Sequence, residues 1–218
     1  MSILYIKDLH YKVDRDHILK GISLEIQEGE CISIVGSSGS GKSTLLKMCA
    51  DLIPITQGDI FFRNKSYKEY SPLDLRKKIS YCVQIPYLFG EKVMENLEFP
   101  FKVRKEKTNR SRILELINIF NLDESVLDKD INSLSGGEKQ RIAIARNLIY
   151  TPEVLLLDEA TASLDKENAS NIEEYIKSIN KQGVTIVWVT HSEEQSKSIF
   201  TKKISMTEGK IVDIHELI

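Results

Sequence analysis

Residues 31–44 read CISIVGSSGSGKST, and this stretch decides the fold. Residues 31–35, of which all but Ser33 are apolar, predict a short buried strand. A loop rich in glycine and serine follows, and good helix formers begin at Lys42. The loop fits the pattern G-x-x-x-x-G-K-[ST], and the order strand, glycine loop, helix is typical of a loop that binds phosphate. The alternative, a glycine-serine turn with an exposed lysine, leaves that order unexplained.

The predicted loop offers phosphate several ligands. Glycines let the backbone approach closely, and the N–H groups of the loop and of the helix start favour an anion. We expect Lys42 to reach the β and γ phosphates of a nucleotide and the Ser43 hydroxyl to ligate Mg²⁺. The residues expected to bind nucleotide here are Gly36, Ser37, Ser38, Gly39, Ser40, Gly41, Lys42, Ser43 and Thr44.

Two carboxylates follow the apolar strand predicted at residues 154–157. In a parallel sheet the C-terminal ends of the strands line the ligand crevice. We therefore expect Asp158 to belong to the Mg²⁺ shell and Glu159 to polarise the attacking water. An acid after a strand can also be a solvated cap, but a phosphate loop in the same chain favours the functional interpretation.

A second glycine motif, LSGGEKQR, occupies residues 134–141 and precedes strong helix formers up to Leu148. Ser135 is suited to cap that helix, and the free N–H groups at the helix start would form a second anion site. From the residues alone, an ordinary capped helix start and a phosphate-recognition element remain equally open.

The rest of the pattern predicts an α/β protein. Further strands are expected near residues 4–9, 18–26, 58–62, 79–83 and 185–189, and helices near 42–52, 110–120 and 165–181. The region 86–150 is helical in character. The strands at 154–157 and 185–189 are almost wholly apolar, as expected for parallel strands covered on both faces.

Composition limits the function classes. The chain has 218 residues, of which 41% are hydrophobic and 28% charged, with a formal net charge of -2, values ordinary for one globular domain. This charge argues against a nucleic-acid or membrane-surface binder. Cys31, Cys49 and Cys82 lack metal-site spacing and are expected to be core thiols. Neither a signal peptide nor a membrane-spanning stretch is predicted.

Together the motifs resemble an ATP-binding cassette protein of the ABC transporter superfamily, over nearly the whole chain. The resemblance is carried by GSSGSGKST (36–44), Gln84, LSGGEKQR (134–141), LLLDEATASLD (155–165) and His191. It implies an α/β fold with a P-loop NTPase (RecA-like) core, an N-terminal antiparallel β-subdomain and an inserted α-helical subdomain. Residues 1–218 would form a single ABC ATPase domain, with its core at 1–85 and 150–218 and the helical subdomain at 86–149.

The resemblance also implies roles by position. Tyr11 would stack on adenine, and the alternative is a core or strand-edge tyrosine with no such role. Ser135, Gly136 and Gly137 would contact the ATP bound on the opposite subunit, and Asp165 would couple the two sites. The implied catalytic residues are Lys42, Gln84, Glu159 and His191, and the implied Mg²⁺ ligands are Ser43, Gln84 and Asp158.

The implied partners are a second cassette and a permease. Two subunits would form a head-to-tail homodimer, or a dimer with a related cassette, around two ATP molecules. A separate transmembrane permease would be driven by this dimer, which would place the chain in the cytoplasm at the inner face of the membrane. The segment 85–101 would face the permease, although packing inside the helical subdomain explains its apolar residues as well.

Two questions stay open at this level. Segments such as 80–84, 88–90, 96–100 and 188–191 look similar to a bacterial branch assigned to iron export. The alternative is a soluble single-cassette ATPase of the iron–sulfur assembly type without a membrane partner. The basic residues between 102 and 112 could meet lipid headgroups or a permease loop, but a solvated helix face is the simpler interpretation.

Overall fold

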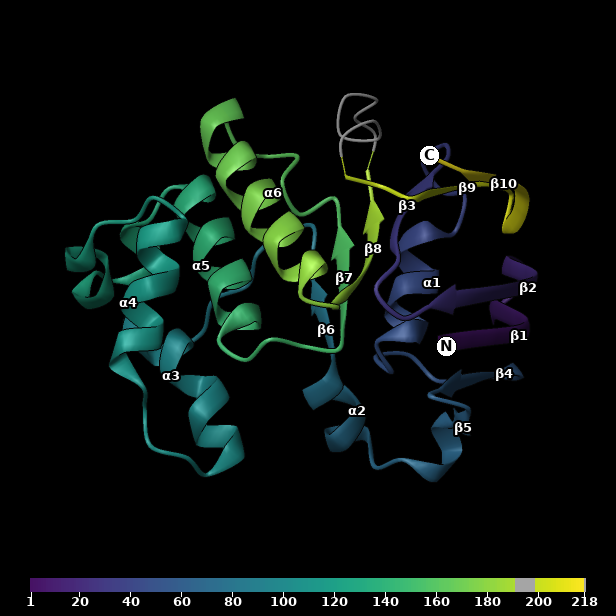
Figure 1. Ribbon diagram of the computed structural model, residues 1–218, viewed down its shortest axis with the longest axis horizontal. Helices are drawn as coiled ribbons and strands as arrows, with labels where there is room; N and C mark the ends of the chain where they lie inside the picture. The colour runs from purple at the N-terminus through teal and green to yellow at the C-terminus, as the bar shows by residue number, and fades with distance from the viewer. Residues whose placement is uncertain (191–198, 218) are drawn as a thin grey trace. The chain divides into compact units, whose positions relative to one another are not determined.

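The computed structural model describes residues 1–190 and 199–217 (Figure 1). The described chain divides into two compact units. The first contains residues 1–81, 152–159 and 180–218, and the second contains residues 82–151 and 160–179.

A six-stranded sheet forms the centre of the first unit, in the order β10-β9-β3-β8-β7-β6. Its strands are β3 (Cys31–Val35), β6 (Ile79–Cys82), β7 (Val154–Asp158), β8 (Thr185–Val189), β9 (Lys202–Thr207) and β10 (Lys210–Glu216). β3 runs parallel to β8 and β9, and β7 runs parallel to β8. Every residue of β7 and β8 is buried, which confirms the expectation from their almost wholly apolar sequences.

A second sheet, antiparallel, is built mainly from the N-terminal segment. Its order is β2-β1-β4-β5, with β1 (Ser2–Val13), β2 (Asp16–Gln27), β4 (Gln57–Phe62) and β5 (Lys65–Ser66). A short helical turn (Tyr67–Glu69) and α2 (Pro72–Lys78) follow β5. The near-alternation of apolar residues in β2 gives this strand one buried face, on which Ile22, Leu24 and Ile26 lie.

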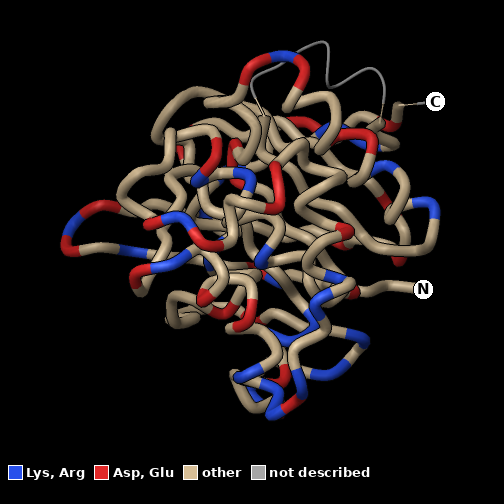
Figure 2. Tube along the Cα trace, turned by 90° about the vertical axis from the view of Figure 1, so that its left-hand side faces the viewer, with Lys and Arg blue, Asp and Glu red and all other residues tan. Residues whose placement is uncertain are grey.

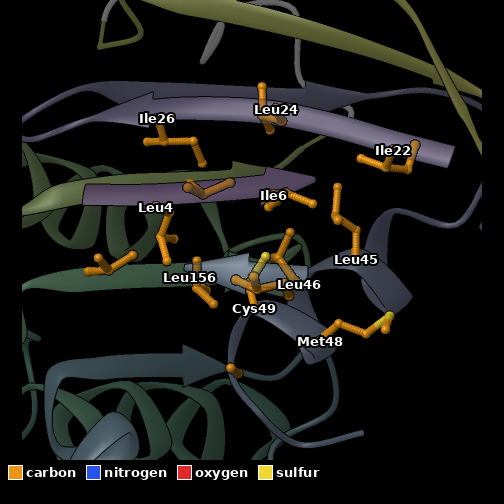
Figure 3. Packing of buried hydrophobic residues seen from close by; sticks show 14 of the residues in the cluster. Leu4, Ile6, Ile22, Leu24, Ile26, Leu45, Leu46, Met48, Cys49 and Leu156 are labelled. Atoms are coloured by element: carbon orange, nitrogen blue, oxygen red, sulfur yellow. The ribbon is translucent and has the colours of Figure 1, made fainter. Parts of the chain in front are cut away.

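Helix α1 (Lys42–Cys49) joins the two sheets through a common core. Its residues Leu45, Leu46, Met48 and Cys49 are buried and belong to one cluster with apolar residues from both sheets (Figure 3). The helix ends three residues earlier than expected, because Asp51 adopts a left-handed backbone with φ 54°. The phosphate loop therefore precedes a helix that the core holds firmly.

The second unit is helical. It contains α3 (Val93–Arg104), α4 (Arg110–Ile119), α5 (Gly136–Leu148) and nearly all of α6 (Lys166–Lys181), with short helical turns at Glu124–Asp128 and Ile131–Ser133. The expected apolar stripe of α4 is buried, through Ile113, Leu116 and Ile117. Within the described residues, the helices all lack the length or apolarity required to cross a bilayer.

Charged side chains are spread along the chain rather than segregated by sign. Figure 2 shows Lys and Arg interleaved with Asp and Glu along much of the trace. Many of them pair, as Arg63 does with Glu28 and Glu153 at 2.7 and 2.6 Å. The interleaving agrees with the formal net charge of -2.

Candidate nucleotide-binding site

The phosphate loop needs glycine at two positions because the backbone around it is tightly packed. A Cβ on Gly36 would lie 2.1 Å from the carbonyl oxygen of Met206. Gly41 has φ 98°, and a Cβ there would lie 2.8 Å from Leu19 Cδ2. Any other residue would clash or strain the backbone, so these glycines fix the path of the loop.

Lys42 is folded back over this loop. Its Nζ donates to the carbonyl oxygens of Gly36 and Ser37 at 2.9 and 2.8 Å. Burial lowers the pKa of Lys42, and the nearby charges of Glu159 and Asp158 oppose that shift. The ammonium group thus lies at the centre of the loop, where a bound phosphate would meet it.

Asp158 and Ser43 come together although 115 positions separate them. Ser43 Oγ donates to Asp158 Oδ1 at 2.9 Å. The second carboxylate oxygen, Oδ2, accepts from the hydroxyl of Tyr81 at 2.7 Å. Two oxygen ligands of the kind that Mg²⁺ prefers are therefore adjacent, and a buried carboxylate fits that ion.

Tyr81 is the residue of this site that sequence reasoning missed. It lies on β6, immediately beside β7 in the sheet order, and this places its hydroxyl at the end of β7. A tyrosine within an apolar strand carries no local signal of such a role. Only the strand order, which the sequence pattern does not specify, brings it to Asp158.

Glu159 follows Asp158 in an unusual backbone conformation. Its φ is 49°, in the left-handed region that non-glycine residues rarely adopt. Its N–H donates to the carbonyl oxygen of Val189 at the end of β8, at 3.0 Å. The backbone therefore turns sharply at the residue expected to polarise water, as is often found at functional sites.

Tyr11 lies on β1 and is half-buried against the core cluster. Its cross-strand partner is Leu19, the residue whose side chain approaches Gly41. Tyr11 is thus one strand away from the phosphate loop. This register suits an aromatic side chain that stacks on a base, and its role stays a prediction.

The signature residues, which are Ser135, Gly136 and Gly137 of the LSGGEKQR motif, form the start of α5 in the second unit. Ser135 Oγ accepts from the N–H of Glu138 at 3.2 Å, and Glu138 Oε2 accepts from the N–H of Ser135 at 2.9 Å. This reciprocal pair confirms the predicted cap. Hydrogen bonds from Ser135, its backbone N–H first, lower the pKa of Glu138. Ser135 and Gly136 are exposed.

Of the remaining predicted residues, Asp165 and Gln84 lie in the second unit. Asp165 is exposed and accepts from the N–H of Asn168 at 3.0 Å, as an N-cap of α6 does. Gln84 is exposed and lies in the second unit, just after β6. His191, which is expected to be catalytic, lies outside the described residues.

Comparison with known proteins identifies the class. The family model described as ABC transporter matches residues 19–162. The chain therefore belongs to the ABC transporter ATP-binding family, and it is an ATPase with the P-loop fold.

Individual relatives agree with this assignment. The chain is 40% identical to the probable iron export ATP-binding protein FetA of Escherichia coli (strain K12), over 88% of this chain and 86% of that protein. It is 36% identical to the methionine import ATP-binding protein MetN of Clostridioides difficile (strain 630), over 97% of this chain and 68% of the relative.

The fold matches a solved ATP-binding cassette, MJ0796, in a dimeric post-hydrolysis state bound to ADP and Pi. The TM-score is 0.90, with 31% identity and 99% of both chains covered. The expected α/β cassette fold is confirmed.

Proposed function

We propose that this chain binds and hydrolyses ATP as the motor subunit of a transporter whose pore is a separate transmembrane permease. The observation that carries the catalytic part is the pairing of Ser43 with Asp158 at 2.9 Å, beside the loop that holds Lys42. The loop N–H groups and Lys42 bind the phosphates of ATP, and Glu159 polarises the attacking water. His191 completes the catalytic residues that the family pattern implies.

Ser43 and Asp158 hold Mg²⁺, and Gln84 is the further ligand that the family pattern implies. The ion neutralises phosphate charge when it is bound. The adjacent hydroxyl and carboxylate oxygens support this assignment, because Mg²⁺ takes oxygen ligands.

Two copies of the chain form a head-to-tail dimer around two ATP molecules. In this arrangement Ser135, Gly136 and Gly137 of one subunit contact the ATP on the other, and Asp165 couples the sites. The exposure of Ser135 and Asp165 supports this, and so does the dimeric state of the solved cassette MJ0796. The N-terminus of α5 supplies positive potential to the phosphates in trans.

Glu159→Gln tests the dimer. The variant should bind ATP and hardly hydrolyse it, so a stable dimer accumulates and elutes early in size-exclusion chromatography. Glu174→Gln, which changes an exposed glutamate of α6, is the matched control and should behave as the parent. A Glu159→Gln protein that stays monomeric with saturating ATP would contradict the proposed head-to-tail dimer.

The permease docks on exposed apolar residues of the second unit. Ile85, Tyr87, Phe99 and Val103 expose 80, 72, 46 and 42% of their surface. Arg146 supports this segment from α5, donating to the Tyr87 carbonyl oxygen at 3.0 Å and to Asn96 Oδ1 at 2.9 Å. Exposed apolar residues on a firmly held segment suit a helix of a membrane partner. The chain thereby reaches the cytoplasmic face of the membrane.

Capture from membranes tests the permease. Tagged Glu159→Gln protein, mixed with ATP and detergent-solubilised native membranes, should retain an integral membrane protein in roughly equal amount, as mass spectrometry would show. Adding Tyr87→Glu should abolish this capture while leaving ATP binding intact. Capture of soluble proteins alone would favour the assembly-type ATPase instead.

We propose that the transporter exports a metal, iron in particular, as the description of FetA says of that protein. The support is the identity to that protein along most of both chains. Cells that lack this chain should hold more iron than the parent when both grow in iron-rich medium, as elemental mass spectrometry of washed cells would show. Equal iron contents would contradict the cargo assignment and leave the ATPase role untouched.

A further inference from the structure

One face of α5 runs along the segment that carries Asp165. Gly137, Gln140 and Arg141 are three and four residues apart, which places them on the same side of the helix. All three meet residues 160–168, which belong to the same unit.

The first two contacts are a hydrogen bond and an apolar packing contact. Gln140 is buried, and its Nε2 donates to the carbonyl oxygen of Ala160 at 2.8 Å. A Cβ added to Gly137 would lie 3.5 Å from Leu164 Cδ2, so the leucine next to Asp165 packs against the signature glycine. These contacts hold the segment at its start and just before Asp165.

Asn168 provides the third contact and connects it to Asp165. Its backbone N–H donates to Asp165 Oδ1 at 3.0 Å, and its Nδ2 donates to Oδ2 at 2.6 Å. The side-chain oxygen of Asn168 accepts from Arg141 Nη1. Hydrogen bonds from Asn168, the backbone N–H first, lower the pKa of Asp165. The amide is thus held between a carboxylate and a guanidinium, and bonds to charged groups are the stronger kind.

Arg141 is itself anchored at the end of α4. Its Nη1 also donates to the carbonyl oxygens of Phe120 and Asn121 at 3.3 and 3.1 Å. Asp165 is therefore connected through Asn168 to Arg141, a residue of α5 that is itself bonded to the C-terminal end of α4.

We propose that Asn168 is a positioning residue that joins the segment carrying Asp165 to helix α5, so that this segment and the start of α5 meet the partner subunit as one rigid surface. This role rests on the head-to-tail dimer proposed above. If the loop and the helix start were independent, each would lose conformational freedom on dimerisation, and affinity would fall. Asn168 removes part of that cost before the subunits meet.

The test measures dimerisation in the Glu159→Gln background by sedimentation velocity with saturating ATP. Asn168→Ala should weaken the dimer by about tenfold, which corresponds to about 1.4 kcal/mol. ATP affinity of the monomer, measured by calorimetry at low protein concentration, should not change. Ser170→Ala, an exposed polar position on the same helix, is the matched control and should dimerise as the parent does.

A double-mutant cycle separates positioning from a general loss of structure. Because Asn168 acts through Asp165, adding Asn168→Ala to Asp165→Ala should cause little further weakening. Asn168→Ser keeps a polar side chain that is too short to join both partners, so it should weaken the dimer as much as alanine, and it serves if the alanine variant folds poorly. Unchanged dimerisation, or full additivity with Asp165→Ala, would overturn the role. A Glu159→Gln parent that does not dimerise would overturn the proposed dimer and this role with it.

Discussion

Both carboxylate oxygens of Asp158 are held by other side chains, Oδ1 by Ser43 and Oδ2 by Tyr81. Loss of a residue that orients a metal ligand usually lowers metal affinity, because a ligand that is free to rotate must be ordered again when the metal binds. The tyrosine hydroxyl is therefore expected to affect Mg²⁺ binding more than nucleotide binding.

Tyr81→Phe removes only that hydroxyl. We expect the Mg²⁺ concentration for half-maximal ATP hydrolysis to rise by about tenfold, while ATP binding in the presence of a chelator stays unchanged. Tyr70→Phe is the matched control, because the Tyr70 hydroxyl donates to the Phe62 carbonyl oxygen, away from Asp158. Equal Mg²⁺ dependence in all three proteins would show that Tyr81 has no part in metal binding.

Lys42 is the charge at the centre of the loop, and Lys42→Ala should abolish detectable ATP binding in calorimetry. Without the ammonium the loop keeps its N–H groups but loses the cation that reaches the outer phosphates. Lys47→Ala, an exposed lysine of the same helix, should bind ATP as the parent does. Retained affinity in Lys42→Ala would be incompatible with this geometry.

At the scale of the element, α5 is the helix whose start is proposed to face a partner. Ser135→Arg places a long cation at the exposed N-cap, where the proposed dimer brings in a second subunit. ATP binding by the monomer should persist, and the ATP-dependent dimer should be lost in size-exclusion chromatography. Ser125→Arg adds the same charge at another exposed position of the unit and should dimerise normally. A dimer formed by Ser135→Arg would refute contact in trans.

The same helix shows which features a sequence can predict. Its start follows from Ser135 and Glu138, because a cap is local and its residues are three positions apart. The strands β7 and β8 were equally predictable from their almost wholly apolar sequences. The left-handed Glu159 and the bonds from Tyr81 to Asp158 and from Arg141 to Asn168 were not. These features depend on the order of the strands and the packing of the helices. The residues in contact are far apart in the sequence, where the local periodicity of the sequence gives no information.

At the scale of the whole molecule, the three cysteines report on both units. Cys31 and Cys49 lie in the first unit and Cys82 in the second, and all are buried. Burial raises the pKa of each thiol to about 12. Since the thiolate is the reactive form, the buried thiols should be far less ionised at pH 8 than free thiols are.

The folded protein should therefore resist a thiol-labelling reagent at pH 8, and all three cysteines should react in strong denaturant.

With rising urea, mass spectrometry of digests should show Cys31 and Cys49 becoming reactive together, because they lie in one compact unit. ATP with Mg²⁺ should move that transition to higher urea, because ligand at 100 times Kd raises the free energy of unfolding by about 2.7 kcal/mol. The transition of Cys82 reports whether the second unit unfolds with the first. Rapid labelling of Cys31 or Cys49 without urea would contradict the buried core, and an unmoved transition with ATP would contradict nucleotide binding by that unit.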